Sequence, residues 1–164
     1  MPNRENNIVI ENAHLLGRSY RNFSGAPKRW TPKGQKAPCT FGLALTPELV
    51  EVFEDKGVNV NYTKPYDDAP EDWEPVPFIN VTARFDNWPP LISMITSRGQ
   101  THLDEDSVSL LDYAEILSAD VTVNVSHWEA RGETGAKVYL NRLYVTIEED
   151  PLDIKYANVP ISEG

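Results

Sequence analysis

Thirteen prolines and nine glycines divide this chain of 164 residues into short segments. Proline fixes its own φ angle and lacks a backbone N–H, while glycine favours turns, so both residues interrupt long helices and central strands. Between these interruptions the sequence contains no internal repeat and no long amphipathic helix. The chain is therefore expected to fold mainly as short β-strands.

Several segments alternate apolar and polar residues, which is the pattern of a half-buried strand. Strands are predicted at residues 8–16, 39–45, 58–62, 78–85, 91–96, 121–126 and 138–147. The last two are joined through turn signals at Gly132 and Gly135 and form the clearest hairpin pattern in the chain. One helix is predicted to start at Pro47, with Thr46 as its N-cap, and another to cover residues 104–117. These elements favour a mainly β fold, a mostly antiparallel barrel or sandwich.

The formal net charge is −10, but the charges are unevenly distributed. Residues 1–37 contain seven Lys or Arg against two Glu, a net +5, whereas the rest of the chain contains eight basic and 23 acidic residues, a net −15. The screening length at physiological salt is ~8 Å, so a polyanion responds to the local charge. The basic segment can therefore bind phosphate, and a solvated loop explains the same charges equally well.

The basic segment also interleaves its cations with aromatic and small polar residues. The candidates for nucleic-acid contacts in it are Arg18, Tyr20, Arg21, Asn22, Phe23, Lys28, Arg29, Trp30 and Lys33. Binding of single strands needs this mixture, because cations follow the phosphates while aromatic rings stack on unpaired bases at ~1–3 kcal/mol per base. The alternative is that Tyr20, Phe23 and Trp30 fill the core and the cations are solvated.

A second candidate surface lies on the polar faces of the predicted strands and on the returning strand of the hairpin. It consists of Phe78, Arg84, Trp128, Tyr139 and Arg142. An aromatic residue on a polar face either stacks on a ligand or is covered by another segment of the chain. The sequence leaves both possibilities open for each of these rings.

Motifs for catalysis and metal binding are largely missing from the sequence. It has no glycine-rich phosphate loop, no His-Glu-x-x-His and no cysteine pair, and its three histidines have no ligand spacing. Acidic residues cluster at 67–72 and 104–106, as Mg²⁺ ligands of a nuclease would, but solvation and helix capping explain both clusters. We therefore expect no catalytic residue, no metal and no cofactor, with a metal-dependent nuclease as an alternative.

The sequence carries no membrane or secretion signal. No apolar run approaches the ~20 residues that span a bilayer, and the first seven residues are polar with no apolar signal core behind them. The single cysteine, Cys39, fits a reducing compartment. A cytoplasmic location is expected from these features.

Several motifs resemble, in order, those of a known family. Residues 10–25, Ile-Glu-Asn-Ala-His-Leu-Leu-Gly-Arg-Ser-Tyr-Arg-Asn-Phe-Ser-Gly, look like the N-terminal signature of single-stranded-DNA-binding proteins of tailed bacteriophages. Further similar pieces lie at residues 41–45, 57–60, 103–108 and 137–147. The resemblance implies an OB-like antiparallel β-barrel without catalysis, which protects single-stranded DNA during phage replication or recombination in the host cytoplasm. The Arg-Asn-Phe core of the family matches Arg21, Asn22 and Phe23.

The expected organisation is one single-stranded-DNA-binding domain over residues 1–148 and an acidic tail over residues 149–164. The sequence Glu-Glu-Asp at 148–150 is similar to tails through which related proteins recruit phage or host replication proteins, although it lacks their apolar tip. The alternative without DNA is an acidic structural or protein-interaction module that contacts a partner through an exposed acidic loop at residues 63–75. The sequence leaves the oligomeric state open.

Overall fold

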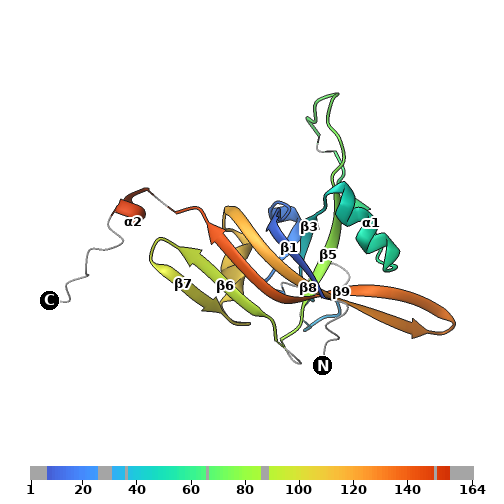
Figure 1. Ribbon diagram of the computed structural model, residues 1–164. Coiled ribbons are helices and arrows are strands. Elements are labelled where there is room, and N and C mark those ends of the chain that lie inside the picture. The colour runs from blue at the N-terminus through green and yellow to red at the C-terminus, as the bar shows by residue number, and fades with distance from the viewer. Residues whose placement is uncertain are drawn as a thin grey trace.

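The computed structural model describes residues 7–25, 31–35, 37–65, 67–85, 89–149 and 151–155 (Figure 1). Its strands are β1 (Asn7–Ala13), β2 (Arg21–Asn22), β3 (Cys39–Ala44), β4 (Asn61–Tyr62), β5 (Pro77–Ala83), β6 (Leu91–Thr96), β7 (Gly99–Leu103), β8 (Ile116–Ala130) and β9 (Glu133–Ile147). Its helices are α1 (Pro47–Asp55) and α2 (Pro151–Lys155), with the 3₁₀ turns η2 (Arg18–Tyr20) and η3 (Val108–Asp112). The prediction of a mainly β chain is confirmed.

The centre of the sheet is the long hairpin formed by β8 and β9. Each of these strands has 15 residues, and they pair antiparallel from Ile116 opposite Ile147 to Ala130 opposite Glu133. β1 pairs with β8, whereas β5 and β6 both pair with β9 and run parallel to it. β3 and β4 pair with β5, β2 pairs with β3, and β7 pairs with β6. Figure 1 shows the end of the hairpin projecting beyond the rest of the sheet.

Six of the eight ladders between the described strands are antiparallel, as a mostly antiparallel fold requires, but the two parallel ladders to β9 make the sheet mixed. Alternation along a strand shows which side chains face the core, but it does not specify the direction of the neighbouring strand. The direction of a neighbouring strand depends on the segment that connects the two strands, and a tight turn between them forces antiparallel pairing. β5 and β6 reach β9 only through β7, η3 and β8, so no such turn constrains them.

Residues 7–16 contact strands on two sides of the core. β1 pairs with β8, while residues 14–16 form backbone hydrogen bonds of 2.8 and 2.9 Å with β3. An irregularity between Ile10 and Ala13, with Asn12 at a φ of 53°, bends the chain between these partners. The ladders of the described strands nevertheless leave the sheet open, in the order β1-β8-β9-β5-β3-β2.

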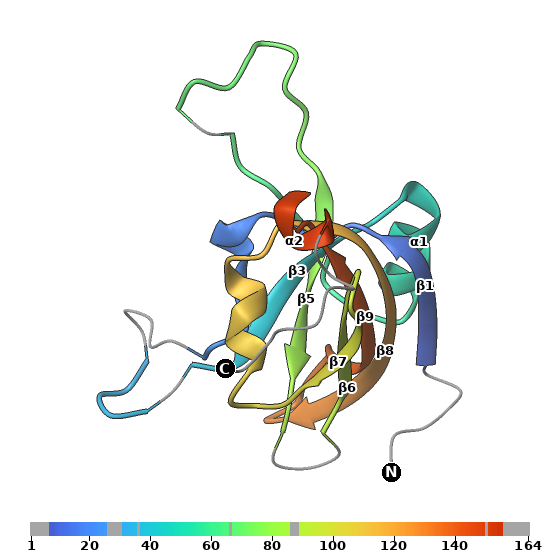
Figure 2. The same ribbon diagram turned by 90° about the vertical axis from the view of Figure 1, so that its left-hand side faces the viewer.

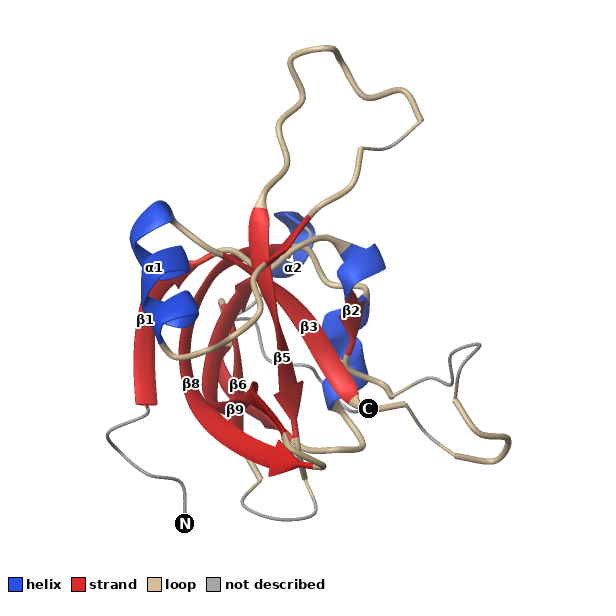
Figure 3. Ribbon diagram, turned by 90° about the vertical axis from the view of Figure 1, so that its right-hand side faces the viewer, coloured by secondary structure: helices blue, strands red, loops and turns tan. Residues whose placement is uncertain are grey.

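The sheet is strongly curved (Figure 3). Its strands contribute most of the residues of one hydrophobic core. Alternate residues of the strands point into it, and side chains such as Phe41 and Leu143 are completely buried. η3 adds Val108 and Leu111, and α1 adds Phe53. The predicted strand pattern therefore identified much of the core correctly.

Helix α1 begins where the sequence predicts. Pro47 is its first residue, and the Thr46 hydroxyl accepts a hydrogen bond from the Leu49 N–H at 3.3 Å. After the helix ends, the Lys56 carbonyl lies 2.6 Å from Nε2 of His127 on β8. This contact joins the projecting part of the hairpin to the end of α1.

The predicted helix over residues 104–117 is wrong. Only residues 108–112 form a helical turn, η3, and the preceding strand β7 was not predicted. The side chains of Asp104 and Ser107 form hydrogen bonds of 2.9 and 3.0 Å with backbone N–H groups of their own turn, which competes with a continuous helix. Hydrogen bonds from Ser107 also hold the pKa of Asp104 below its ordinary value.

The acidic segment at residues 63–75 is a loop, as predicted. Its described residues leave the sheet between β4 and β5 and project away from the body (Figure 2). The predicted strand at 58–62 is reduced to the two residues of β4. Within the described ranges, no helix is long and apolar enough to cross a membrane.

Candidate nucleic-acid interface

One face of the β8–β9 hairpin is turned away from the core. On β9, Val138 and Leu140 are buried, so Lys137 and Tyr139 point to the opposite side. The register then shifts by one residue, which brings Arg142 to the same side as Tyr139. We define the hairpin face as Arg84, Trp128, Lys137, Tyr139 and Arg142.

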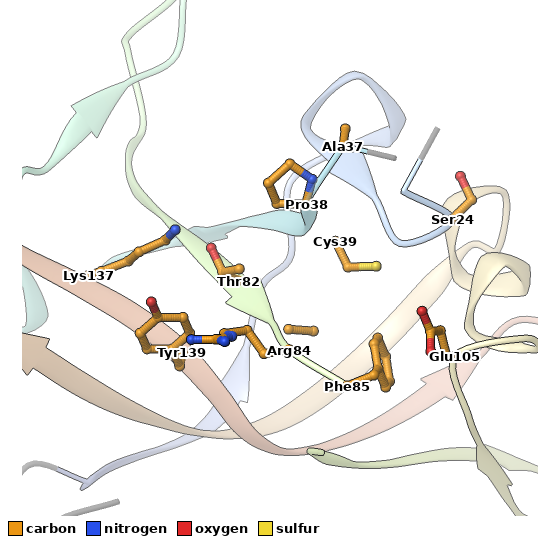
Figure 4. A pocket seen from close by; sticks show the side chains of 11 residues that line it. Ser24, Ala37, Pro38, Cys39, Thr82, Arg84, Phe85, Glu105, Lys137 and Tyr139 are labelled. Carbon is orange, nitrogen blue, oxygen red and sulfur yellow. The ribbon is translucent and has the colours of Figure 1, made fainter. Parts of the chain in front are cut away.

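Tyr139 lies between two cations on the hairpin face (Figure 4). The Lys137 Nζ atom is 5.6 Å and the Arg84 Cζ atom 5.8 Å from the centre of the tyrosine ring, within the ~6 Å of cation–π contacts. Arg84 follows β5, whose Thr82 is paired with Tyr139. Both cations are exposed and the ring is half-buried. The three side chains combine a fixed aromatic ring with two groups that can bind phosphate.

Trp128 occupies the part of the hairpin face near the end of the hairpin. Its side chain is 46% exposed and lies against Gly135, its partner on β9. A Cβ atom at position 135 would overlap the indole ring, so the glycine allows this position of Trp128. The indole rests on the backbone of β9 and keeps nearly half of its surface available to a ligand.

A pocket of about 470 Å³ opens beside Tyr139 (Figure 4). Its walls include Ser24, Cys39, Thr82, Arg84, Phe85, Glu105, Lys137 and Tyr139. The hairpin face supplies one side of the pocket, and segments near β3 and η3 supply the other. The pocket therefore combines aromatic, hydroxyl, cationic and anionic groups next to the exposed cations.

Arg21, the first residue of the Arg-Asn-Phe core, binds backbone groups of the chain itself. Its Nε donates to the Leu16 carbonyl at 2.9 Å, and one terminal nitrogen donates to the carbonyls of Ala114 at 2.7 Å and Leu111 at 3.3 Å. The guanidinium thereby joins the start of β2 to η3 and the residues after it. The structure places Arg21 between segments of the fold and not on the hairpin face.

Phe23 and Asn22 are buried, with exposed fractions of 1% and 6%. The Phe23 ring stacks on Phe41, with 5.2 Å between ring centroids and 19° between ring planes. Its backbone N–H donates to the Asp112 carboxylate at 2.6 Å, which fixes the segment against η3. Phe23 therefore fills the core. This was one of the two roles that the sequence allowed for the ring, the other being stacking on a base.

Phe78 is covered by another segment of the chain. It is 7% exposed, and the half-buried Tyr20 packs against it edge to face, with 5.1 Å between ring centroids and 67° between ring planes. Gly42 leaves room for the segment that carries Leu16 and Tyr20, since a Cβ atom there would lie 2.9 Å from Leu16 Cδ1 and 3.3 Å from Tyr20 Cβ. The alternation of residues along β5 predicted that Phe78 lies on the face opposite the core. It could not show that Tyr20 covers this ring.

Only one of the remaining candidates of the basic segment, Lys33, has a described side chain. Outside the described residues lie Lys28, Arg29 and Trp30, as well as the side chain of Arg18. Lys33 is exposed. A hydrogen bond of 3.0 Å from the Ala37 N–H to the Gly25 carbonyl joins the residues that flank positions 26–36, and Ala37 lines the pocket.

Three charged or aromatic residues that line the pocket, Phe85, Glu105 and Lys137, were not among the predicted contacts. Lys137 could have been found, because it precedes Tyr139 by two residues on the same strand face. Alternation along the predicted strand 78–85 places Phe85 on the core side, and its half-buried ring does pack against the core while it also lines the pocket. Glu105 belongs to an acidic cluster that solvation and helix capping explain. In the part of the chain that the structure describes, no group of three or more His, Cys, Asp or Glu could hold a metal ion.

Comparison with known proteins decides the family. The model of a family described as "Putative phage ssDNA-binding domain" matches residues 2–164. The chain belongs to this family. The resemblance predicted from the ordered motifs is thereby confirmed for this phage ssDNA-binding domain. No curated protein sequence matches it.

Solved structures share the fold of this phage ssDNA-binding domain. The single-stranded DNA-binding protein from bacteriophage Enc34 in complex with ssDNA is 9% identical, with 90% of each chain covered and a TM-score of 0.54. A C-terminal truncation of the Enc34 protein is 10% identical, with 90% of this chain and 89% of that chain covered and a TM-score of 0.52. At these identities the similarity shows a common fold alone.

Proposed function

We propose that this chain binds single-stranded DNA through the hairpin face without catalysing a reaction. In this function it protects single-stranded intermediates of phage replication or recombination in the cytoplasm of the host. The observation that carries the proposal is the Tyr139 ring between Lys137 and Arg84, at 5.6 and 5.8 Å. A base stacks on such a ring while the neighbouring cations bind the phosphates on either side.

The chemistry of the hairpin face favours binding that tolerates any sequence. Every base has a π-face, so stacking on Tyr139 and Trp128 does not depend on which base is present. Lys137, Arg84 and Arg142 are exposed cations on a chain with a net charge of −10. The acidic remainder repels DNA from other surfaces and confines it to this face.

The basic segment is proposed as a second wall of the site. Gly25 and Ala37, which flank residues 26–36, are joined by a backbone hydrogen bond, and Ala37 lines the pocket, which supports a position of this segment beside the hairpin face. The contacts proposed for the basic N-terminal segment as a whole are Arg18, Lys28, Arg29, Trp30 and Lys33. Arg21, Asn22 and Phe23 act in this scheme by anchoring this segment to the core.

We further propose that residues 1–148 form one OB-like barrel and that residues 149–164 form an acidic tail for phage or host replication proteins. The hydrogen bonds between residues 14–16 and β3 support the barrel, because they link the end of the β1 segment to the far side of the sheet. At the start of the tail, the Glu149 carboxylate accepts hydrogen bonds from the N–H and hydroxyl of Ser97 at 2.8 and 2.9 Å. These bonds fix where the tail leaves the domain.

Titration of a fluorescent oligo-dT at several salt concentrations tests the function. We expect micromolar or tighter binding at ~50 mM salt. Displacing counterions from a single strand gives a slope of log K against log salt of about −0.7 per phosphate contact, so the three cations of the hairpin face predict a slope of about −2 or steeper. The strand should stay intact in Mg²⁺. No change in polarisation at low salt, or cleavage of the strand, would contradict the proposal.

A further inference from the structure

Glu105 places a carboxylate on the wall of the pocket across from the cations. Figure 4 shows it beside Phe85, on the side of the pocket opposite Lys137 and Tyr139. It sits on a turn fixed by hydrogen bonds between Asp104 and Ser107. The side chain is exposed, so it can reach a ligand that enters the pocket.

A carboxylate in this place does not help to bind the DNA backbone. An ionised carboxylate only accepts hydrogen bonds, and it repels the negatively charged phosphates that Arg84 and Lys137 attract. The groups of a DNA strand that can donate to it are on the bases, above all the exocyclic amino groups of cytosine, adenine and guanine. Thymine and uracil present a carbonyl oxygen at the corresponding position, and their one donor on this edge, the N3–H, lies between two carbonyl oxygens that repel a carboxylate.

The other walls suit the rest of a base. Phe85 and Tyr139 are half-buried aromatic rings that offer faces or edges to a flat ligand. A volume of about 470 Å³ lies within the range of roughly 300–1,000 Å³ that is usual for small-ligand pockets. Because Tyr139 belongs to both the hairpin face and the pocket, a strand on that face passes the mouth of the pocket.

We propose that the pocket receives one unstacked base of the bound strand and that Glu105 accepts a hydrogen bond from its exocyclic amino group. Bases with an amino group are therefore bound more tightly than thymine or uracil. The inference rests on the proposed function, since the base is delivered by a single strand on the hairpin face. It adds a modest base preference to a surface that otherwise tolerates any sequence.

The test compares oligo-dC with oligo-dU of equal length on the full chain, by fluorescence polarisation at constant salt. These two strands differ in the group at C4 and in the protonation of N3, and neither carries the thymine methyl group. We expect the unmodified chain to bind oligo-dC about tenfold more tightly, as one well-formed contact to a base edge is worth ~1–3 kcal/mol. Glu105→Gln should bring the ratio of the two affinities close to one, because an amide both donates and accepts.

Glu71→Gln is the matched control, because it removes the same charge from an exposed position in the acidic loop. It should strengthen both affinities slightly and leave their ratio unchanged. Equal binding of oligo-dC and oligo-dU by the unmodified chain, or an unchanged ratio in Glu105→Gln, would overturn the pocket inference and leave the single-strand function intact. Absence of binding to both strands would overturn the function and the inference together.

Discussion

Tyr139→Ala is expected to weaken the binding of oligo-dT roughly five- to hundredfold. The substitution removes the ring between Arg84 and Lys137, and base stacking on an aromatic residue is worth ~1–3 kcal/mol. Loss of the ring also removes the cation–π contacts that Arg84 and Lys137 make with it. Fluorescence polarisation at constant salt measures the change in Kd.

Two further variants make this result specific. Tyr139→Phe keeps the ring and should keep most of the affinity. Tyr62→Ala removes a tyrosine that is 54% exposed on β4 and should leave the affinity unchanged. If Tyr139→Ala and Tyr62→Ala bind oligo-dT equally well while both are folded by circular dichroism, the hairpin face is not the stacking surface.

Phe23→Ala is expected to lower the free energy of unfolding by about 3–5 kcal/mol, as removal of a buried phenylalanine usually does. The ring is 1% exposed and stacks on Phe41, so its loss leaves a cavity in the core. A domain has only about 5–15 kcal/mol of stability, so this one change accounts for a large part of it. Urea unfolding followed by tryptophan fluorescence gives the difference.

The DNA affinity of the same variant separates the two roles that the sequence allowed for Phe23. At a temperature where the variant is still folded, its Kd for oligo-dT should stay within about twofold of the unmodified chain, since no base contacts the ring. Phe23→Leu, which conserves most of the volume, should lose less than about 1.5 kcal/mol. A Phe23→Ala variant of unchanged stability that no longer binds DNA would show that the ring contacts a base.

The hairpin and its outward side chains could be predicted from the sequence because they depend on local alternation. Val121, Val123 and Val125 alternate with polar residues, and a period of two fixes which side of the strand each residue faces. The same rule placed Trp128 away from the core, whereas Tyr139 was predicted only to lie on the returning strand of the hairpin. The proximity of Tyr139 to Arg84 needed the structure, since the parallel pairing of β5 with β9 does not follow from any local pattern.

The basic N-terminal segment shows where the sequence could not decide. An arginine, a phenylalanine and a tyrosine in one short stretch suit both DNA binding and the anchoring of a loop. Arg21 is held inside the fold by carbonyl groups some 90 residues away in the chain. Phe23 is held in the core by stacking on the ring of Phe41. Such long-range partners leave no periodic signal in the sequence.

The central claim is that a single strand lies on the hairpin face, and photo-crosslinking tests it most directly. Oligo-dT carrying 5-iodouracil, irradiated in complex with the full chain, reacts with the aromatic side chains that lie against the base, and mass spectrometry identifies them. We predict crosslinks at Tyr139 and Trp128. Crosslinks found only at aromatic residues away from this face, such as Tyr62, Trp73 or Tyr113, would contradict the account.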